Sequence, residues 1–83
     1  MKLVYFAWVR EKIGAAEENI ELPEAVKDIS ELFSFLKNSD EKYAAAFENQ
    51  AIINVAIDHE QVSHDTLIAG AQEIAFFPPM TGG

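Results

Sequence analysis

The chain has 83 residues, of which 49% are hydrophobic and 24% charged, and its 14 acidic residues against 6 basic ones give a formal net charge of −8. This length allows a single domain with one apolar core, and the composition is that of a folded chain. The negative charge disfavours nucleic acid and anionic lipid surfaces as partners. It favours a basic protein surface, or simply keeps a small protein soluble. Because cysteine is absent, disulfides and thiolate chemistry are excluded.

The N-terminal segment is apolar but unsuited to membrane insertion or export. Lys2 interrupts it, Arg10 follows too soon, and it has no small-residue cleavage pattern. We therefore expect neither a signal peptide nor a membrane span, and a cytoplasmic location by default.

The same segment, residues 2–9 (KLVYFAWV), is rich in aromatic and β-branched residues, which predicts a strand. Side chains alternate along a strand, so Val4, Phe6 and Trp8 would share a face whose two ends are charged. A face with charged ends is expected to point away from the core. Its apolar residues are then too large to be left in water without a reason.

Further strands are expected along the chain. Residues 11–16 form a connection, and residues 19–22 predict a second strand in a hairpin with the first. Residues 51–57 predict a third strand, a brief edge strand is expected near Val62, and residues 73–77 predict the last strand.

One amphipathic helix is expected between the second and third strands. Asp28 followed by Glu31 is typical of a helix N-cap with its reciprocal partner. Apolar residues then follow at the helical spacing i, i+3, i+4 and i+7, beginning at Ile29. A short second helix is expected over residues 43–47.

The order of these elements describes a mixed sheet with one main helix on one face. A ubiquitin-like β-grasp fold of the α+β class is the economical arrangement, because the two terminal strands can lie side by side and parallel. We expect a domain over residues 1–77 and a flexible C-terminal tail over residues 78–83. The other sheet face stays uncovered, and we expect a partner-binding surface there. Its candidate residues are Val4, Phe6, Trp8 and Phe77.

The C-terminal residues 76–83 (FFPPMTGG) are the most informative segment. Two prolines cannot donate to a sheet, so the chain should leave it as a stiff spacer, and paired glycines can pass a narrow channel. The carboxylate of Gly83 would react once an ATP-using partner had adenylated it, and sulfur could then replace AMP to give a thiocarboxylate. A frayed terminus is the simpler alternative. The tail residues are Pro78, Pro79, Met80, Thr81, Gly82 and Gly83.

Two segments carry a family resemblance. Residues 73–83 (EIAFFPPMTGG) resemble the ending of the small, sulfur-carrying subunits of molybdopterin synthase, within the ubiquitin-like sulfur-carrier family. Residues 4–14 (VYFAWVREKIG) resemble that family's first strand and the arginine-bearing turn after it. The chain departs from the family pattern in the turn before the last strand, where Ala71 and Gln72 precede Glu73, and at Asp58, where the family commonly has Asn.

The resemblance implies a mechanism. A ubiquitin-activating-type enzyme using MgATP would adenylate Gly83, which would become a thiocarboxylate and enter the active site of a large synthase subunit. There its sulfur would pass to cyclic pyranopterin monophosphate, within a heterotetramer of two small and two large subunits. Phe77 would belong to the interface. The chain itself would bind no cofactor or metal and supply no catalytic side chain.

Several rival functions share the fold. Carriers for thiamine synthesis or tRNA thiolation also end in Gly-Gly, although the thiamine carrier typically lacks the aromatic and Pro-Pro ending. A protein modifier would instead join Gly83 to lysines of target proteins, and a noncovalent β-grasp interaction domain would not need the tail. An acid–base or metal site using His59 and His64 is the weakest alternative, because polar residues around a surface turn explain them as well.

Overall fold

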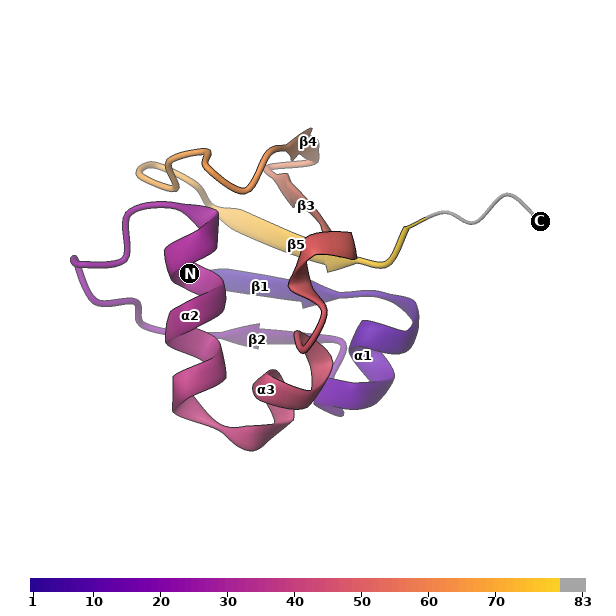
Figure 1. Ribbon diagram of the computed structural model, residues 1–83. Helices are drawn as coiled ribbons and strands as arrows, with labels where there is room; N and C mark the ends of the chain where they lie inside the picture. Colours follow the sequence, from indigo (N-terminus) through magenta and orange to yellow (C-terminus); the bar gives the residue numbers. More distant parts are fainter. Residues whose placement is uncertain (80–83) are drawn as a thin grey trace.

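The computed structural model describes residues 1–79. Within them, five strands form one mixed sheet in the order β2-β1-β5-β3-β4 (Figure 1). The central strands β1 and β5 are parallel, and their neighbours pair antiparallel. The predicted parallel pairing of the terminal strands is therefore confirmed. The strands are β1 (Lys2–Tyr5), β2 (Glu17–Asn19), β3 (Asn54–Ile57), β4 (Glu60–Val62) and β5 (Glu73–Phe77).

Helices cover one face of this sheet, and α2 (Ile29–Ser39) is the longest of them (Figure 1). The predicted cap of α2 is confirmed, because the Asp28 side chain accepts from the Glu31 N–H at 2.8 Å. Glu31 Oε1 in turn accepts from the Lys27 N–H at 3.0 Å. The other helical segments are α1 (Ala7–Ile13), α3 (Glu41–Ala46) and the 3₁₀ turn η1 (Gln50–Ile52). Among residues 1–79, no helix has the length and apolar character needed to cross a bilayer.

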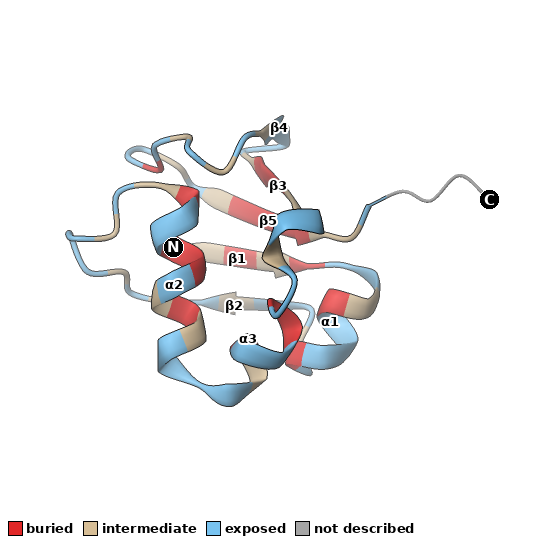
Figure 2. Cartoon of the chain, viewed as in Figure 1, coloured by how far each residue is buried: buried red, intermediate tan, exposed pale blue. Residues whose placement is uncertain are grey.

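The core lies between α2 and the sheet, where the buried residues face one another (Figure 2). The predicted stripe of α2, from Ile29 to Leu36, is fully buried. Phe33 is central, with its ring centroid 5.0 Å from that of Phe47 and 5.4 Å from that of Phe76. Such edge-on aromatic contacts add to the free energy gained by burying apolar surface. The core therefore joins α2 to the last strand and to the segment that follows α3.

The prediction that the first strand reaches Val9 is wrong. β1 ends at Tyr5 and α1 begins at Ala7, which places Trp8 on a helix, away from the strand face assigned to it. Val9 and Ile13 are buried four residues apart, and Gly14, with φ +86°, ends the helix. Burial of this helical pair outweighs the strand propensity of the segment. The spacing of Val9, Ile13 and Gly14 was a helix signal in the sequence.

The boundaries of several other elements differ from the predicted ones by a few residues. β2 occupies residues 17–19 in place of the expected 19–22, and β3 begins at Asn54 because η1 takes up the preceding residues. The short helix α3 is confirmed but begins earlier, since Asp40 accepts from the Lys42 N–H at 3.0 Å and caps it. β5 has its predicted bounds, and the edge strand near Val62 is confirmed as β4.

A polar network ties the edge strand β2 to the core. Glu18 Oε1 accepts hydrogen bonds from the hydroxyls of Tyr5, at 2.8 Å, and Tyr43. Lys42 Nζ lies 3.0 Å from Glu18 Oε2. Burial raises the pKa of Glu18, but the hydrogen bonds from Tyr43, Lys42 and Tyr5 outweigh it, so the pKa is lowered. The carboxylate form of Glu18 is thus favoured by folding.

The lowered pKa of Glu18 predicts a loss of stability in acid. The folded state binds this proton less readily than the unfolded chain, so the contribution is complete above the unfolded pKa of about 4.3 and is lost as pH falls below it. We expect Glu18→Gln to unfold about 1–2 kcal/mol more easily near neutral pH and to show a flatter decline in acid. Urea unfolding across acidic and neutral pH measures this. Glu17→Gln, on the same strand but more exposed, is the control. Equal acid profiles for the two variants would contradict the assignment.

Candidate functional site

The sheet face opposite α2 carries an apolar hollow of about 540 Å³. Phe6 and Phe77 line it, together with the small side chains of Ala56 on β3 and Ala75 on β5, which are paired across the two strands. Within residues 1–79, Phe6 is one of three large hydrophobic residues that are strongly exposed, at 47%. We call the surface formed by these four residues the open face. The remaining residues lining the hollow are His59, Gln61 and Glu73.

Charged residues lie next to the open face, where strands β1 and β5 begin. Lys2 Nζ lies 3.5 Å from Glu17 and 3.6 Å from Glu73, and His59 Nε2 lies 3.8 Å from the other Glu73 oxygen. By strand alternation the side chains of Lys2, Glu17 and Glu73 share the parity of Val4 and Ala75. An apolar patch bordered by charged residues is the composition typical of a protein–protein interface.

The apolar end of this face is also where the tail begins. β5 ends at Phe77, where the chain leaves the sheet (Figure 1). The half-buried Pro78 and the exposed Pro79 follow it. Neither proline has an N–H to extend the sheet, so the ladder stops there. The predicted tail residues Met80, Thr81, Gly82 and Gly83 lie outside the described residues.

The predicted surface residues occupy different environments. Phe6 and Phe77 line the same hollow, and Val4 is half-buried on the same side of β1. Trp8 instead packs partly against the core from α1, with Lys12 Nζ 5.6 Å from its ring centroid. Sequence analysis missed Ala56, although its alternation with Ile53 and Val55 already placed it on the outer face.

The two histidines lie in unrelated environments. The His64 ring packs 5.1 Å from that of Phe33, and its Nε2 lies 2.7 Å from the Ile53 carbonyl oxygen. His59 is exposed and pairs with Glu73. Across residues 1–79, no three His, Asp or Glu side chains are grouped as a metal ion would require. His64 is thus a packed residue of the core's edge.

Asp58 holds the turn that departs from the family pattern. Its Oδ1 accepts from the N–H groups of Gln72, at 3.0 Å, and Glu73, at 2.9 Å. Asp58 and His59 both have positive φ, 47° and 73°, in the tight turn between β3 and β4. The carboxylate therefore joins this hairpin to the start of β5 and sets the position at which the last strand begins.

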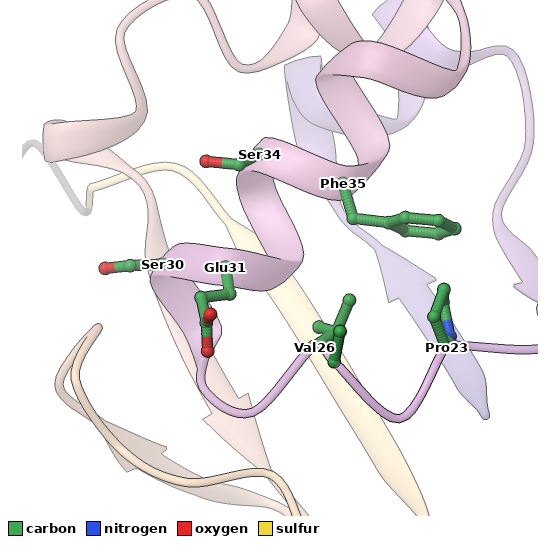
Figure 3. A pocket seen from close by; sticks show the side chains of 7 residues that line it. Pro23, Val26, Ser30, Glu31, Ser34 and Phe35 are labelled. Carbon is green, nitrogen blue, oxygen red and sulfur yellow. The ribbon is translucent and has the colours of Figure 1, made fainter.

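A second hollow, of about 500 Å³, lies on the outer side of α2, away from the open face. Figure 3 shows its side chains gathered between α2 and the loop before it. It contains none of the predicted site residues. Its lining residues are Pro23, Ala25, Val26, Ser30, Glu31, Ser34 and Phe35.

The sheet order, the crossing helix and the open face define a ubiquitin-like β-grasp protein. The ThiS family model matches residues 3–83, so the chain belongs to the ThiS family. The molybdopterin synthase sulfur carrier subunit of Escherichia coli K12 is 32% identical over 85 residues, covering 100% of this chain and 99% of that protein. The predicted family and fold are thereby confirmed.

Solved structures agree with this assignment. Molybdopterin converting factor, subunit 1, from Pyrococcus furiosus is 31% identical, with a TM-score of 0.71 over 94% of each chain. SAMP1 from Haloferax volcanii is 22% identical, with a TM-score of 0.72 over 100% of this chain and 98% of that one. At this lower identity the second likeness demonstrates the fold alone.

Proposed function

We propose that this chain is the sulfur-carrier subunit of a molybdopterin synthase. The observation that carries the proposal is the full-length similarity to curated sulfur carrier subunits of that enzyme, together with the Gly-Gly end. The structure supports it by starting the tail at the apolar end of an exposed docking face. The name of the Pyrococcus relative, a molybdopterin converting factor, favours this pathway over thiamine synthesis or tRNA thiolation.

The proposed chemistry takes place at the C-terminal carboxylate of Gly83. A partner enzyme holding MgATP lets a carboxylate oxygen attack the α-phosphate, which releases pyrophosphate and forms an acyl-adenylate. A donor's sulfur at the oxidation level of sulfide then attacks the acyl carbon and displaces AMP, which leaves a thiocarboxylate. Partner enzymes supply the catalytic groups, and this chain supplies the carboxyl group that carries the sulfur and positions it.

Delivery of the sulfur depends on docking. We infer that the open face contacts the large subunit. Six residues, the number that follow β5, can span at most about 20 Å when fully extended, a length that would reach a deep active site. There the sulfur passes to cyclic pyranopterin monophosphate on the way to molybdopterin. The net charge of −8 favours a basic surface on the partner and raises the rate of association.

Reconstitution tests this function. The purified chain is incubated with its activating enzyme, MgATP and a sulfur donor, and its intact mass is measured. We expect one oxygen to be replaced by sulfur at Gly83, and the product to yield molybdopterin when the large subunit and cyclic pyranopterin monophosphate are added. Failure to gain sulfur would contradict the proposal, and Gly-Gly remnants on lysines of other cellular proteins would indicate a modifier.

Truncating the two aromatic side chains tests the docking surface. We expect Phe6→Ala and Phe77→Ala each to weaken binding of the large subunit by about 2 kcal/mol, because aromatic residues at the centre of a patch dominate interface energy. Both rings are partly exposed, so unfolding should change by less than about 1 kcal/mol. Titration calorimetry and urea unfolding measure the two effects. Leu67→Ala, an exposed residue outside the hollow, is the control, and a larger effect on folding than on binding would refute the surface.

A further inference from the structure

The chain turns sharply where β1 ends. Phe6 still has extended backbone, with φ −123° and ψ 154°, and its N–H donates to the Phe76 carbonyl oxygen at 3.1 Å. Phe6 therefore continues the strand by one residue, and its ring keeps the outward parity of Val4. Ala7 then has φ +52° and begins α1. The whole change of direction takes place at Ala7, directly beside the residue that lines the open face.

We call this change of direction at Phe6 and Ala7 the corner. Two of its features are unfavourable by local conformational preference. Ala7 is in the left-handed region, which L-residues other than glycine rarely adopt. Phe6 occupies the N-cap of α1, where a small polar side chain would satisfy a helix N–H, and among residues 1–79 no side chain caps this end. Two adjacent departures from local preference indicate that another requirement outweighs them.

The surroundings hold the corner in place. The Phe6 carbonyl oxygen accepts from the N–H groups of Val9, at 3.1 Å, and Arg10, at 3.3 Å. The buried side chains of Val9 and Ile13 anchor α1 in the core. The Phe6 backbone is thus bonded to β5 on one side and to α1 on the other. Strand alternation directs the Phe6 ring outward, while the neighbouring Tyr5 side chain is buried on the core side of β1.

We propose that Ala7 is a positioning residue for partner docking. Its left-handed backbone ends the strand in a single step and holds the Phe6 ring on the open face, beside Phe77 and the start of the tail. A ring that is already fixed loses little conformational freedom on binding, which favours affinity. The inference rests on the proposed function in taking the large synthase subunit as the partner.

Backbone preference at position 7 can be changed without removing the Phe6 ring. Because the chain has 83 residues, chemical synthesis can place D-alanine, which favours positive φ, at position 7. Ala7→Gly tolerates positive φ, whereas Ala7→Val disfavours it strongly. Ala25→Val, at an exposed position, is the matched control. It belongs to the segment between β2 and α2, which lies at the opposite end of the molecule from α1 (Figure 1).

Three measurements are made on each chain. They are the dissociation constant for the large synthase subunit, the melting temperature, and the NMR contacts of the Phe6 ring with Ala75 and Phe77. We expect Ala7→Val to bind about tenfold more weakly and to lose these contacts. The glycine and D-alanine chains should keep the contacts, melt no lower than wild type and bind within about twofold of it. The control should match wild type.

Several results would overturn the inference. A folded Ala7→Val chain with unchanged affinity and contacts would do so, and so would a D-alanine chain that melts lower than wild type or binds as weakly as Ala7→Val. If Ala7→Val fails to fold, the affinity, melting temperature and NMR contacts of the glycine and D-alanine chains still test the inference. If wild type does not bind the large subunit at all, the proposed function fails, while melting temperatures and NMR contacts still test the corner.

Discussion

Deleting Gly83 is expected to abolish sulfur transfer while leaving the domain as stable as wild type. The proposed reaction takes place on the carboxylate of this one residue, and the shortened chain would present its carboxylate one residue short of the partner's active site. A displacement of that size removes the alignment on which group transfer depends. The core that stabilises the domain ends at Phe76, several residues earlier. Molybdopterin formation with purified partners measures activity, and urea unfolding measures stability.

A chain extended by one tryptophan after Gly83 provides a second variant. It keeps every native residue but blocks the carboxylate, so it should be equally inactive and equally stable. Thr81→Ser, in the same tail, is the control and should retain most activity. Normal cofactor synthesis by either C-terminal variant, without trimming in the assay, would show that the carboxylate of Gly83 is not the carrier group.

Phe33→Ala is expected to lower the free energy of unfolding by about 4 kcal/mol, the largest single effect on stability that we predict. Phe33 is fully buried and contacts the rings of Phe47, Phe76 and His64, so its removal leaves a cavity where α2 meets the sheet. A domain of this size is stable by only about 4–12 kcal/mol. The variant should therefore be largely unfolded at moderate urea concentrations, as circular dichroism would measure.

Phe35→Ala is the matched control for Phe33→Ala. Phe35 lies on the same helix but is only half-buried, beside the hollow shown in Figure 3. Removing a partly exposed ring loses less apolar contact and leaves no closed cavity, so we expect a loss of about 1 kcal/mol. Equal losses for the two variants would mean that the core is not centred on Phe33.

The elements that the sequence predicted well are those whose pattern is repeated several times. The helix over residues 29–39 shows four apolar residues at helical spacing after a capping pair, and β5 is bounded by a turn and two prolines. The outward parity of Phe6 was also correct, because strand alternation persists one residue beyond β1. The family followed from residues 73–83, and the comparisons confirm it.

What the sequence could not predict depends on contacts between distant segments. The stretch from Ala7 to Val9 has strand-forming residues, yet it is helical because α1 packs against α3 and buries Val9. No local pattern in the sequence distinguishes Glu18, yet it accepts hydrogen bonds from two tyrosines far away in sequence. Local pattern is ambiguous over three or four residues, and such segments adopt the structure that buries most apolar surface.

The sequence by itself thus predicted the parallel pairing of the terminal strands and the helix that covers them, and the chemistry proposed for the Gly-Gly end rests on it alone. These depend on periodicity, proline and glycine, whose effects on the backbone are local. Only the tertiary structure decided that the chain turns at Ala7 and that Trp8 lies on a helix, away from the open face. Those outcomes depend on which buried residues pack together, and local preference is too weak to oppose that packing.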